Sequence, residues 1–442
     1  MFPNPQDALP LPPRPSLNQY KKLAKDLVKA CKSDDAGAIR TWAKRWVDTL
    51  MKLTALAIPP DLPVHLDRWV NGVEEFARRR FRGAKSDELE CTLSSAQFVI
   101  ARSHGFESWP RFAQHLEELA GAHSPISNFE AAADAVISGD IETLESLLAE
   151  DPKLARQPST REHGAALLHY VSANGVEGYR QRTPRNAVKI AELLLNAGAD
   201  VNATASVYGG GATALGLVAT SVHPERAGVQ RALMELLLAH GALPDSPAGE
   251  GLIVNACLAN GRPRAAEFLA DRGAHVDLEA AAGMGALDRV KSYFRADGSL
   301  QSGATKTQLD RGFLWACEYG YTNVIEYLLD HGADPQAQAG TGHSALHWAV
   351  IGGHLDTIQL LLSRGASLEA TNAYGGTALG QALWSAVNGD PARDHAKIVE
   401  VLLEAGAKVT DSSIAWLERQ TNGSASMKER VAEVLRRHVR RS

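Results

Sequence analysis

Apolar residues gather in short runs that recur along most of the chain. Six of these runs each end in a Gly-Ala pair, at Gly198, Gly241, Gly273, Gly332, Gly365 and Gly406. The spacings between these glycines are 43, 32, 59, 33 and 41 residues, and the longest one contains a weaker run, "SYFRADG", with Gly298. The base period is therefore close to 33 residues, with three units lengthened. Such a period predicts a repeat architecture.

Each unit has the hydrophobic pattern of two short helices. An apolar helix comes first, then a turn with glycine, then a leucine-rich helix that the Gly-Ala pair closes. Glycine suits that place because it readily adopts the left-handed conformation that ends many helices. One helical pair cannot bury its own apolar face, so neighbouring units must stack on one another. We therefore expect an all-α solenoid.

The clearest unit, Gly340–Thr371, carries a specific motif. It reads "GTGHSALHWAVIGGHLDTIQLLLSRGASLEAT" and resembles an ankyrin repeat, whose pattern is G-x-T-P-L-H-x-A-A-x-x-G-H, a leucine-rich helix and then G-A. The matching residues are Gly342, Leu346, His347, Ala349, Gly353 and His354, while Ser344 stands for the threonine and Ala345 for the proline. The resemblance implies an ankyrin-repeat solenoid of about eight helix-turn-helix units over residues 126–411.

Both ends of the chain depart from this period. Residues 1–15 are rich in proline and are expected to form an extended arm. Residues 16–122 predict a small helical domain, broken by "IPPDLP" at 58–63, and their stretch "TLSSAQFVIARSHGFESWPRF" resembles the helical leader found ahead of ankyrin arrays in many bacterial proteins. Residues 412–442 lack the Gly-Ala closure, and their apolar stripe predicts a C-terminal helical cap.

Composition narrows the function classes. The formal net charge of −5 is too small to favour nucleic-acid binding, and the acidic excess lies in the repeats, so we expect no nucleic-acid partner. No apolar stretch is long enough to span a membrane, so we expect no membrane partner. Four cysteines form no CxxC pair and lie in apolar helical stretches: Cys31, Cys91, Cys257 and Cys317. This pattern predicts reduced thiols, no metal site, no cofactor and a cytoplasmic location.

The motif "TGHSALHWAVIGGH" at 341–354 holds three histidines and a serine. A catalytic triad or a zinc site would need a further group that the motif lacks. The ankyrin resemblance instead implies structural roles, in which His347 hydrogen-bonds within and between units and His354 helps to finish a first helix. We therefore assign no catalytic residue and lean toward a protein that is not an enzyme.

The resemblance also implies where a partner would bind. Ankyrin proteins use a concave groove lined by hairpin tips and by the two variable positions before the Gly-His pair. The corresponding residues here are Asn174, Asn260, Glu318, Tyr319, Ile351 and Trp384, with Tyr208, His343 and Tyr374 near tips. Exposed tyrosine and tryptophan are favoured interface anchors. The first hypothesis is therefore a non-catalytic scaffold that binds a protein or peptide, although Tyr319 and Trp384 could instead pack on neighbouring units.

Two further tryptophans, Trp315 and Trp348, occupy the position after the motif's histidine. For both we expect packing in the core.

Three units are lengthened between their two helices, around residues 176–187, 222–231 and 388–395. The first two insertions are adjacent in the array and are expected to share one neighbourhood, with Tyr179, Arg180, Arg182, Arg185, His223, Glu225 and Arg226. Arginine suits carboxylate or phosphate recognition. The alternative function is therefore an enzyme or a binder of a small molecule or anion, with His169 and Tyr170 as further candidates. The same charges could simply brace the loops, paired with Glu177 and Glu225.

Overall fold

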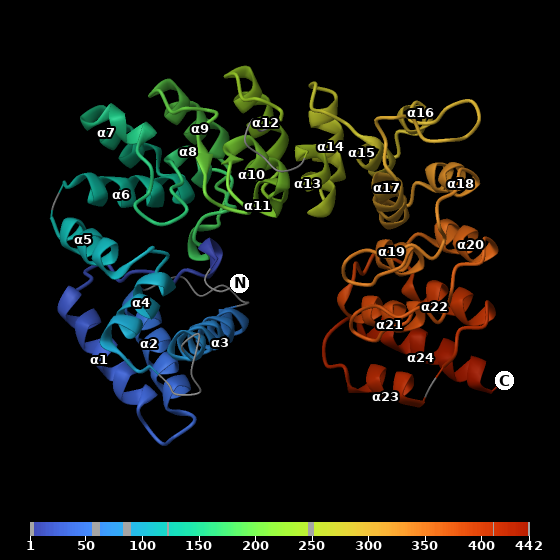
Figure 1. The fold of residues 1–442 in the computed structure, drawn as a ribbon, viewed down its shortest axis with the longest axis horizontal. Helices are drawn as coiled ribbons and strands as arrows, with labels where there is room; N and C mark the ends of the chain where they lie inside the picture. Colours follow the sequence, from blue (N-terminus) through green and yellow to red (C-terminus); the bar gives the residue numbers. More distant parts are fainter. Residues whose placement is uncertain are drawn as a thin grey trace. The chain divides into compact units, whose positions relative to one another are not determined.

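The computed structural model describes residues 4–54, 62–82, 90–121, 123–245, 252–409 and 411–440. These ranges contain 24 α-helices and one short two-stranded sheet (Figure 1). The predicted all-α class is confirmed. The chain divides into two compact units, residues 1–253 (unit 1) and 254–442 (unit 2). No helix in the described part of the chain is long and apolar enough to cross a membrane.

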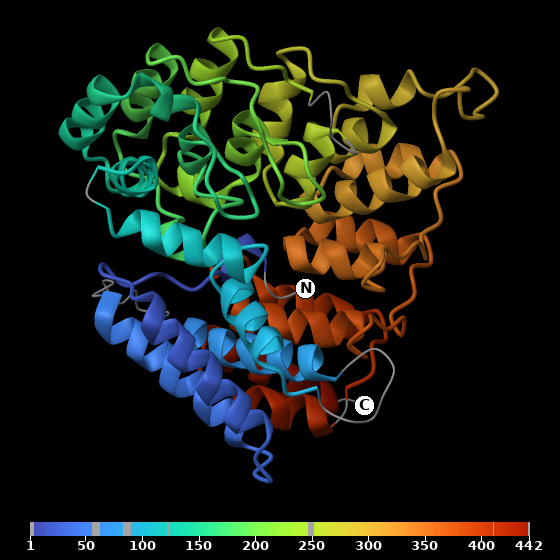
Figure 2. The ribbon, with the colours of Figure 1, turned by 60° about the vertical axis from the view of Figure 1, so that its left-hand side comes forward.

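Unit 1 begins with five helices, blue to cyan in Figure 2: α1 (Leu17–Cys31), α2 (Ala38–Thr54), α3 (Leu62–Phe81), α4 (Leu93–Ser103) and α5 (Trp109–Leu119). Their shared core buries aromatic side chains, among them Trp46, Phe81 and Phe112. The expected break at 58–63 lies partly outside the described residues, and Leu62 and Pro63 already belong to α3. Thr92 begins α4 by accepting a hydrogen bond from the Ser95 amide at 3.2 Å.

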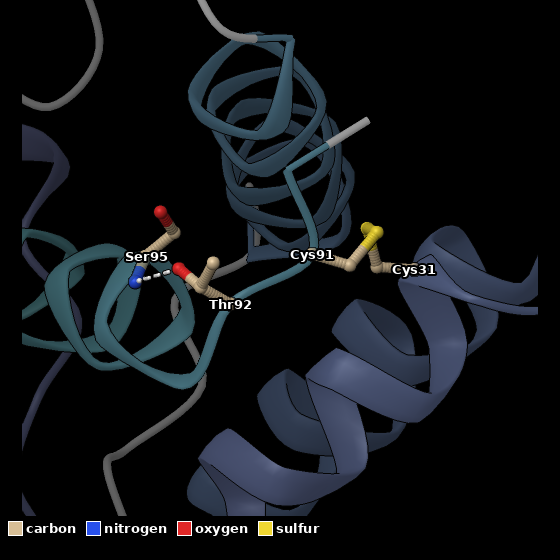
Figure 3. The surroundings of a disulfide bond; sticks show 4 residues. All are labelled: Cys31, Cys91, Thr92 and Ser95. Atoms are coloured by element: carbon tan, nitrogen blue, oxygen red, sulfur yellow. Dashed lines mark hydrogen bonds between the residues drawn. A yellow bond between two sulfur atoms is a disulfide. The ribbon is translucent and has the colours of Figure 1, made fainter. Parts of the chain in front are cut away.

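The prediction of four reduced cysteines is wrong for one pair. Cys31, the last residue of α1, forms a disulfide with Cys91, just ahead of α4 (Figure 3). Their Cα atoms lie 5.8 Å apart, although 60 residues separate them in the chain. Because α1 packs beside α4, the fold brings together two thiols that the sequence alone does not pair. Cys257 and Cys317 are free and buried, as expected.

The N-terminal arm is packed rather than free. Residues Pro5–Asp7 form a 3-10 turn, and Ala8 and Leu9 are buried. The Leu9 amide donates to the carbonyl of Ser103 at 2.7 Å, and the Leu9 carbonyl accepts from Nδ1 of His104 at 2.9 Å. The arm is thus fixed to the end of α4 by one hydrogen bond in each direction.

The repeats of unit 1 follow these five helices. Their elements are α6 (Pro125–Ser138), α7 (Ile141–Glu150), the 3-10 turn η2 (Pro152–Arg156), α8 (Leu167–Tyr170), the 3-10 turn η3 (Gly178–Arg180), α9 (Ala187–Asn196), β1 (Thr204–Ala205), β2 (Ala212–Thr213), α10 (Ala214–Thr220), α11 (Val222–Arg226) and α12 (Gln230–Ala239). Strands β1 and β2 pair antiparallel as a hairpin between repeats. The first helix of the second repeat shrinks to the single turn α8, so its insertion replaces regular structure with an irregular loop.

Unit 2 continues the helical pairs from α13, whose first residue still belongs to unit 1. They are α13 (Ile253–Ala259) with α14 (Pro263–Ala270), α15 (Leu278–Gly283) with α16 (Leu287–Lys291), α17 (Lys306–Tyr319) with α18 (Thr322–Asp330), α19 (Ala345–Gly352) with α20 (Leu355–Ser363), and α21 (Ala378–Asn388) with α22 (His395–Glu404). The predicted glycine closures are left-handed, as at Gly332 (φ +89°), Gly365 (φ +81°) and Gly406 (φ +99°). From α15 to α21, the first helices of successive pairs pack side by side over one apolar core.

Two helices close unit 2, α23 (Asp411–Arg419) and α24 (Ala425–Val439). Helix α24 packs on α21 and α22 and buries Met427, Val431 and Leu435. It therefore covers apolar surface that a further repeat would otherwise cover.

Candidate functional site

The histidine at the centre of the 341–354 motif joins two repeats. Nε2 of His347 donates to the carbonyl of Gly376, in the next repeat, at 2.9 Å. Nδ1 then accepts, from the Ser344 hydroxyl at 2.8 Å and the Ser344 amide at 3.2 Å. Burial lowers the pKa of His347, which keeps the ring neutral. Since both ring nitrogens are occupied by the scaffold, His347 is structural, as the motif implied.

The Gly-His histidine acts on the preceding repeat. Nε2 of His354 donates to the carbonyl of Glu318, near the end of α17, at 2.9 Å. That carbonyl is one of the acceptors that a helix end leaves without an intrahelical partner. The resemblance implied that this histidine finishes a first helix, and the helix it finishes is the one of the repeat before.

Six aromatic rings run in unbroken contact along unit 2, and we call them the aromatic row. The centroid distances are 6.4 Å for Tyr321–Tyr319, 6.3 Å for Tyr319–Trp315, 6.3 Å for Trp315–Trp348, 5.1 Å for Trp348–His343 and 6.3 Å for His343–Tyr374. Its members come from α17, the turn between α17 and α18, α19 and two hairpin tips. The row thus follows the face that the first helices and the tips share.

Trp348 packs against the apolar core of unit 2, as expected, and its indole nitrogen is buried. Trp315 and Trp348 are both only partly buried, and each stands five residues before the left-handed glycine that ends its helix, Gly320 or Gly353. The indole N–H of Trp315 donates to the carboxylate of Glu279 on α15 at 3.0 Å. Trp315 therefore contacts the neighbouring first helix through Glu279, and the expectation of core packing holds for Trp348.

Glu318 lies beside this row, one helical turn from Trp315 on α17. Burial raises the pKa of its carboxyl group to about 7. Its Oε2 atom is buried and has no hydrogen-bond partner among the described residues. Nearby, the hydroxyl of Tyr319 donates to the carbonyl of Leu258 on α13, so Tyr319 is anchored to another repeat. Glu318 is a carboxylate that the fold desolvates but does not pair.

The other predicted groove positions in unit 2 are open. Trp384 is 50% exposed, and Tyr374 is 82% exposed at its hairpin tip. Trp384 follows the N-cap of α21, Thr377, by seven residues, and Ile351 follows the N-cap of α19, Ser344, by the same number. The two side chains therefore hold equivalent places in adjacent repeats.

The insertion of the second repeat forms a buried charge cluster, which contains Glu130, Arg161, Glu177 and Arg180. Arg161 pairs with Glu130 and, through Nε at 2.8 Å, with Glu177. Arg180 lies 2.8 Å from Oε2 of Glu130 and 3.6 Å from Oε1 of Glu177. Burial alone would raise the pKa of Glu177, but the charges of Arg161 and Arg180 and the hydrogen bond from His163 together outweigh it and hold that pKa well below its usual range. The cluster is compact and internally neutralised.

The ion pairs of Arg180 connect the insertion of the second repeat to α6. Arg180 also pairs with Asp134 of α6 at 2.8 Å, so its partners come from the repeat before rather than from the third repeat's insertion. Tyr179 is within 3.5 Å of Arg161. Arg182, Arg185 and Arg226 are exposed, and His223 lies on α11. The bracing interpretation is confirmed for the pair Arg180–Glu177.

Two other residues of the alternative hypothesis serve the scaffold. Nε2 of His169 donates to the carbonyl of Ala203 at 3.0 Å, and Nδ1 accepts from the Ala166 amide at 3.1 Å. This is the arrangement of His347 repeated in unit 1. Tyr170 is buried with its hydroxyl 3.5 Å from Glu177. The described residues also contain no group of three or more histidine, cysteine or acidic side chains placed to hold a metal ion.

Comparison with known families bears on the repeats directly. Residues 313–413, which include the whole aromatic row, match the family model for ankyrin repeats in three copies. The chain contains ankyrin repeats. A comparison with curated proteins gives no match for this chain. The proposed number of about eight repeats and the leader resemblance extend beyond the matched range and stay predictions.

The ankyrin groove positions predicted in unit 1 contact the protein's own arm. The hydroxyl of Tyr208 lies 2.7 Å from Oδ1 of Asn174 and donates to Oε1 of Gln6 at 3.2 Å. A side chain at Gly178 would collide with the carbonyl of Gln6, so arm and insertion are in close backbone contact. Asn174 also donates to the hydroxyl of Thr220 at 3.1 Å. Asn174 and Tyr208 therefore have partners within unit 1, unlike the open positions of unit 2.

Sequence reasoning missed three partners of the candidate sites. Glu130 and Arg161 complete the buried cluster, and Glu279 holds the indole of Trp315. Arg161 lies in a loop with no periodic pattern, and Glu279 lies in a repeat that matches the ankyrin pattern poorly. Of the three, only Glu130 could have been found from the sequence, because it is an acidic residue on the otherwise apolar buried face of α6.

Replacing Glu318 with glutamine is expected to stabilise the protein at pH 8. The folded pKa of about 7 lies above the usual 4.5, so the folded state holds an unfavourable charge above pH 7 and little of it below pH 4.5. Glu318→Gln should raise the free energy of unfolding by roughly 1 to 3 kcal/mol at pH 8 and change it little at pH 4.5. Urea denaturation at both pH values measures this.

The matched control for that experiment is Glu326→Gln. Glu326 lies on α18 and forms an exposed ion pair with Arg364 at 3.7 Å. An exposed ion pair contributes little to the free energy of unfolding. Equal effects of the two substitutions, or no dependence on pH for Glu318→Gln, would contradict the assignment of a desolvated carboxylate.

Proposed function

We propose that this protein is a non-catalytic scaffold that binds a partner protein through the groove of its ankyrin repeats in unit 2. The observation that carries the proposal is the aromatic row, which includes the exposed Tyr374, together with the exposed Trp384. Ankyrin repeats generally mediate protein–protein interaction. Large aromatic side chains at the centre of an interface supply much of the binding free energy, because they bury apolar area at a small entropic cost.

The alternative function, an enzyme or anion binder at the insertions, has less support. Arg161 and Arg180 already face carboxylates, so neither offers its charge to an anion. His169 and His347 use both ring nitrogens in the scaffold, which leaves no basic nitrogen for proton transfer. These arginines and histidines therefore act in ion pairs and hydrogen bonds that hold the scaffold together.

The nature of the partner follows in part from charge. Residues 313–413 hold 4 lysines and arginines against 11 aspartates and glutamates. Such a surface repels nucleic acid, so a protein or peptide remains the proposed partner. The proposed cytoplasmic location rested in part on the expectation of reduced cysteines. The Cys31–Cys91 disulfide removes that support, because disulfides persist mainly in oxidising compartments.

Truncating the open anchors tests the scaffold function. Trp384→Ala and Tyr374→Ala should each weaken binding to proteins recovered by the wild-type chain at least about tenfold, as expected for interface anchors worth roughly 2 kcal/mol. Affinity capture from host lysate with quantitative mass spectrometry, followed by titration of the recovered proteins, measures the change. Leu53→Ala is the control, because Leu53 is an exposed apolar residue of α2 in unit 1. Retention of every partner by both variants would overturn the proposal.

A further inference from the structure

We infer that the groove of unit 2 recognises an arginine side chain of its partner, held between the aromatic row and the carboxylate of Glu318. The inference rests on the proposed scaffold function and adds the chemistry of the bound segment. Three features of unit 2 support it: the unpaired acid, the aromatic faces next to it, and the acidic surroundings.

The first feature is the contrast between the two carboxylates near the row. Glu279 accepts from the indole of Trp315 at 3.0 Å and has the guanidinium of Arg311 at 3.8 Å. Glu318 has no comparable partner in the described part of the chain, and its Oε2 is buried without a hydrogen bond. A desolvated carboxylate gains most from a cation that arrives with hydrogen-bond donors. The missing partner of Glu318 is therefore a cationic group from outside the chain.

The second feature is the geometry around that carboxylate. Glu318 is three residues from Trp315 on α17, so both side chains lie on one helix face. Trp315 stacks with Tyr319 at an interplanar angle of 22° and continues to Trp348 on α19. The face of an indole attracts a cation, and it does so more strongly when the site is partly desolvated. An acid beside indole rings is the combination that holds a charged, flat group.

The third feature is long-range charge. The matched repeats carry 7 more acidic than basic residues, so a basic segment is drawn toward the groove and an acidic one is repelled. Arginine fits better than lysine because its planar guanidinium can stack on an indole while its edge donates hydrogen bonds to a carboxylate. The ammonium group of lysine is a point charge that can do only part of this.

Peptides selected on the full-length protein test the inference. A random library of 12-residue peptides displayed on phage is panned against the wild-type chain, and the selected peptides are synthesised with a fluorescent label. Each is also made with its arginine replaced by lysine or by citrulline, which keeps the shape of arginine without its charge. Binding is measured by fluorescence anisotropy.

The selected peptides are expected to share an arginine, and citrulline in its place should weaken binding at least about tenfold. Glu318→Gln should produce a loss of similar size, and it should add little to the loss from citrulline because both remove the same interaction. Glu326→Gln, which removes the same charge from the outer helix α18, should leave the affinity unchanged. Selected peptides that lack arginine, or citrulline peptides that bind as well as their parents, overturn the inference.

Failure of the inference is distinguishable from failure of the scaffold function. If the selected peptides lose affinity with Trp384→Ala but not with citrulline or Glu318→Gln, the groove binds peptides and the arginine preference is wrong. If no selected peptide depends on Trp384, Tyr374 or Glu318, or if the library yields no binder, both proposals are wrong for this surface.

Discussion

Glu177→Gln is expected to lower the free energy of unfolding of unit 1 by about 3 to 5 kcal/mol, because it removes one charge from a buried network and leaves the others uncompensated. Glu177 is fully buried and pairs with Arg161 at 2.8 Å, while Arg180 lies 3.6 Å away. Denaturation in urea at pH 7, followed by circular dichroism, measures the change. The exposed residue Glu145 on α7 supplies the control, since Glu145→Gln removes an equal charge from a solvated surface.

The same substitution has a defined dependence on pH. The pKa of Glu177 is held well below its usual value of 4.5, so the stability that its charge supplies is fully present above pH 4.5. It is lost as the pH falls from 4.5 toward the folded pKa, and the gap between wild type and Glu177→Gln should narrow over that interval. A gap at pH 7 no larger than that of Glu145→Gln would show that the cluster does not hold unit 1 together.

Reducing the Cys31–Cys91 disulfide is expected to lower the stability of unit 1 by about 2 to 4 kcal/mol. The bond closes a loop of 60 residues and thereby restricts the unfolded chain, which is the main source of stabilisation in the chain-entropy description. Urea denaturation with and without a reducing agent measures the loss. The double variant Cys31→Ser/Cys91→Ser is the matched control, because its stability should not respond to the reducing agent.

Thiol alkylation followed by mass spectrometry provides an independent readout for this bond. Denatured, unreduced protein should expose two reactive thiols, Cys257 and Cys317, and four after reduction. Four reactive thiols before reduction would mean that the disulfide is absent from the purified protein, and the predicted response to reduction would then not occur.

The fold could be predicted because its signal is local and repeated. Each Gly-Ala closure marks a helix end by a conformation that only glycine adopts easily, and the same mark recurs at a regular interval. The structural roles of His347 and His354 followed from the same motif. Where a unit departs from the pattern, as at α8 with only four residues, the position of the insertion could be predicted but its conformation could not.

The candidate sites were harder to predict from the sequence, because their contacts join residues that are far apart in the chain. Arg161 and Glu130 are 31 residues apart and meet only once two repeats and a loop are in place. Cys31 and Cys91 meet only because α1 packs beside α4. Trp315 and Trp348 show a different limit, since periodicity identifies the helix position that they share but does not predict that Trp348 packs against the core while Trp315 bonds to Glu279.

The hydrogen bond from His354 to the carbonyl of Glu318 has an evolutionary consequence. It fixes the main chain at a proposed recognition position from the neighbouring repeat, while the Glu318 side chain takes no part in that bond. Mutation can therefore exchange the carboxylate for another group without loosening the frame that presents it. Binding specificity can therefore change through single substitutions. Deleting a whole repeat would instead remove the histidine N–H that bonds the helix-end carbonyl of the preceding repeat.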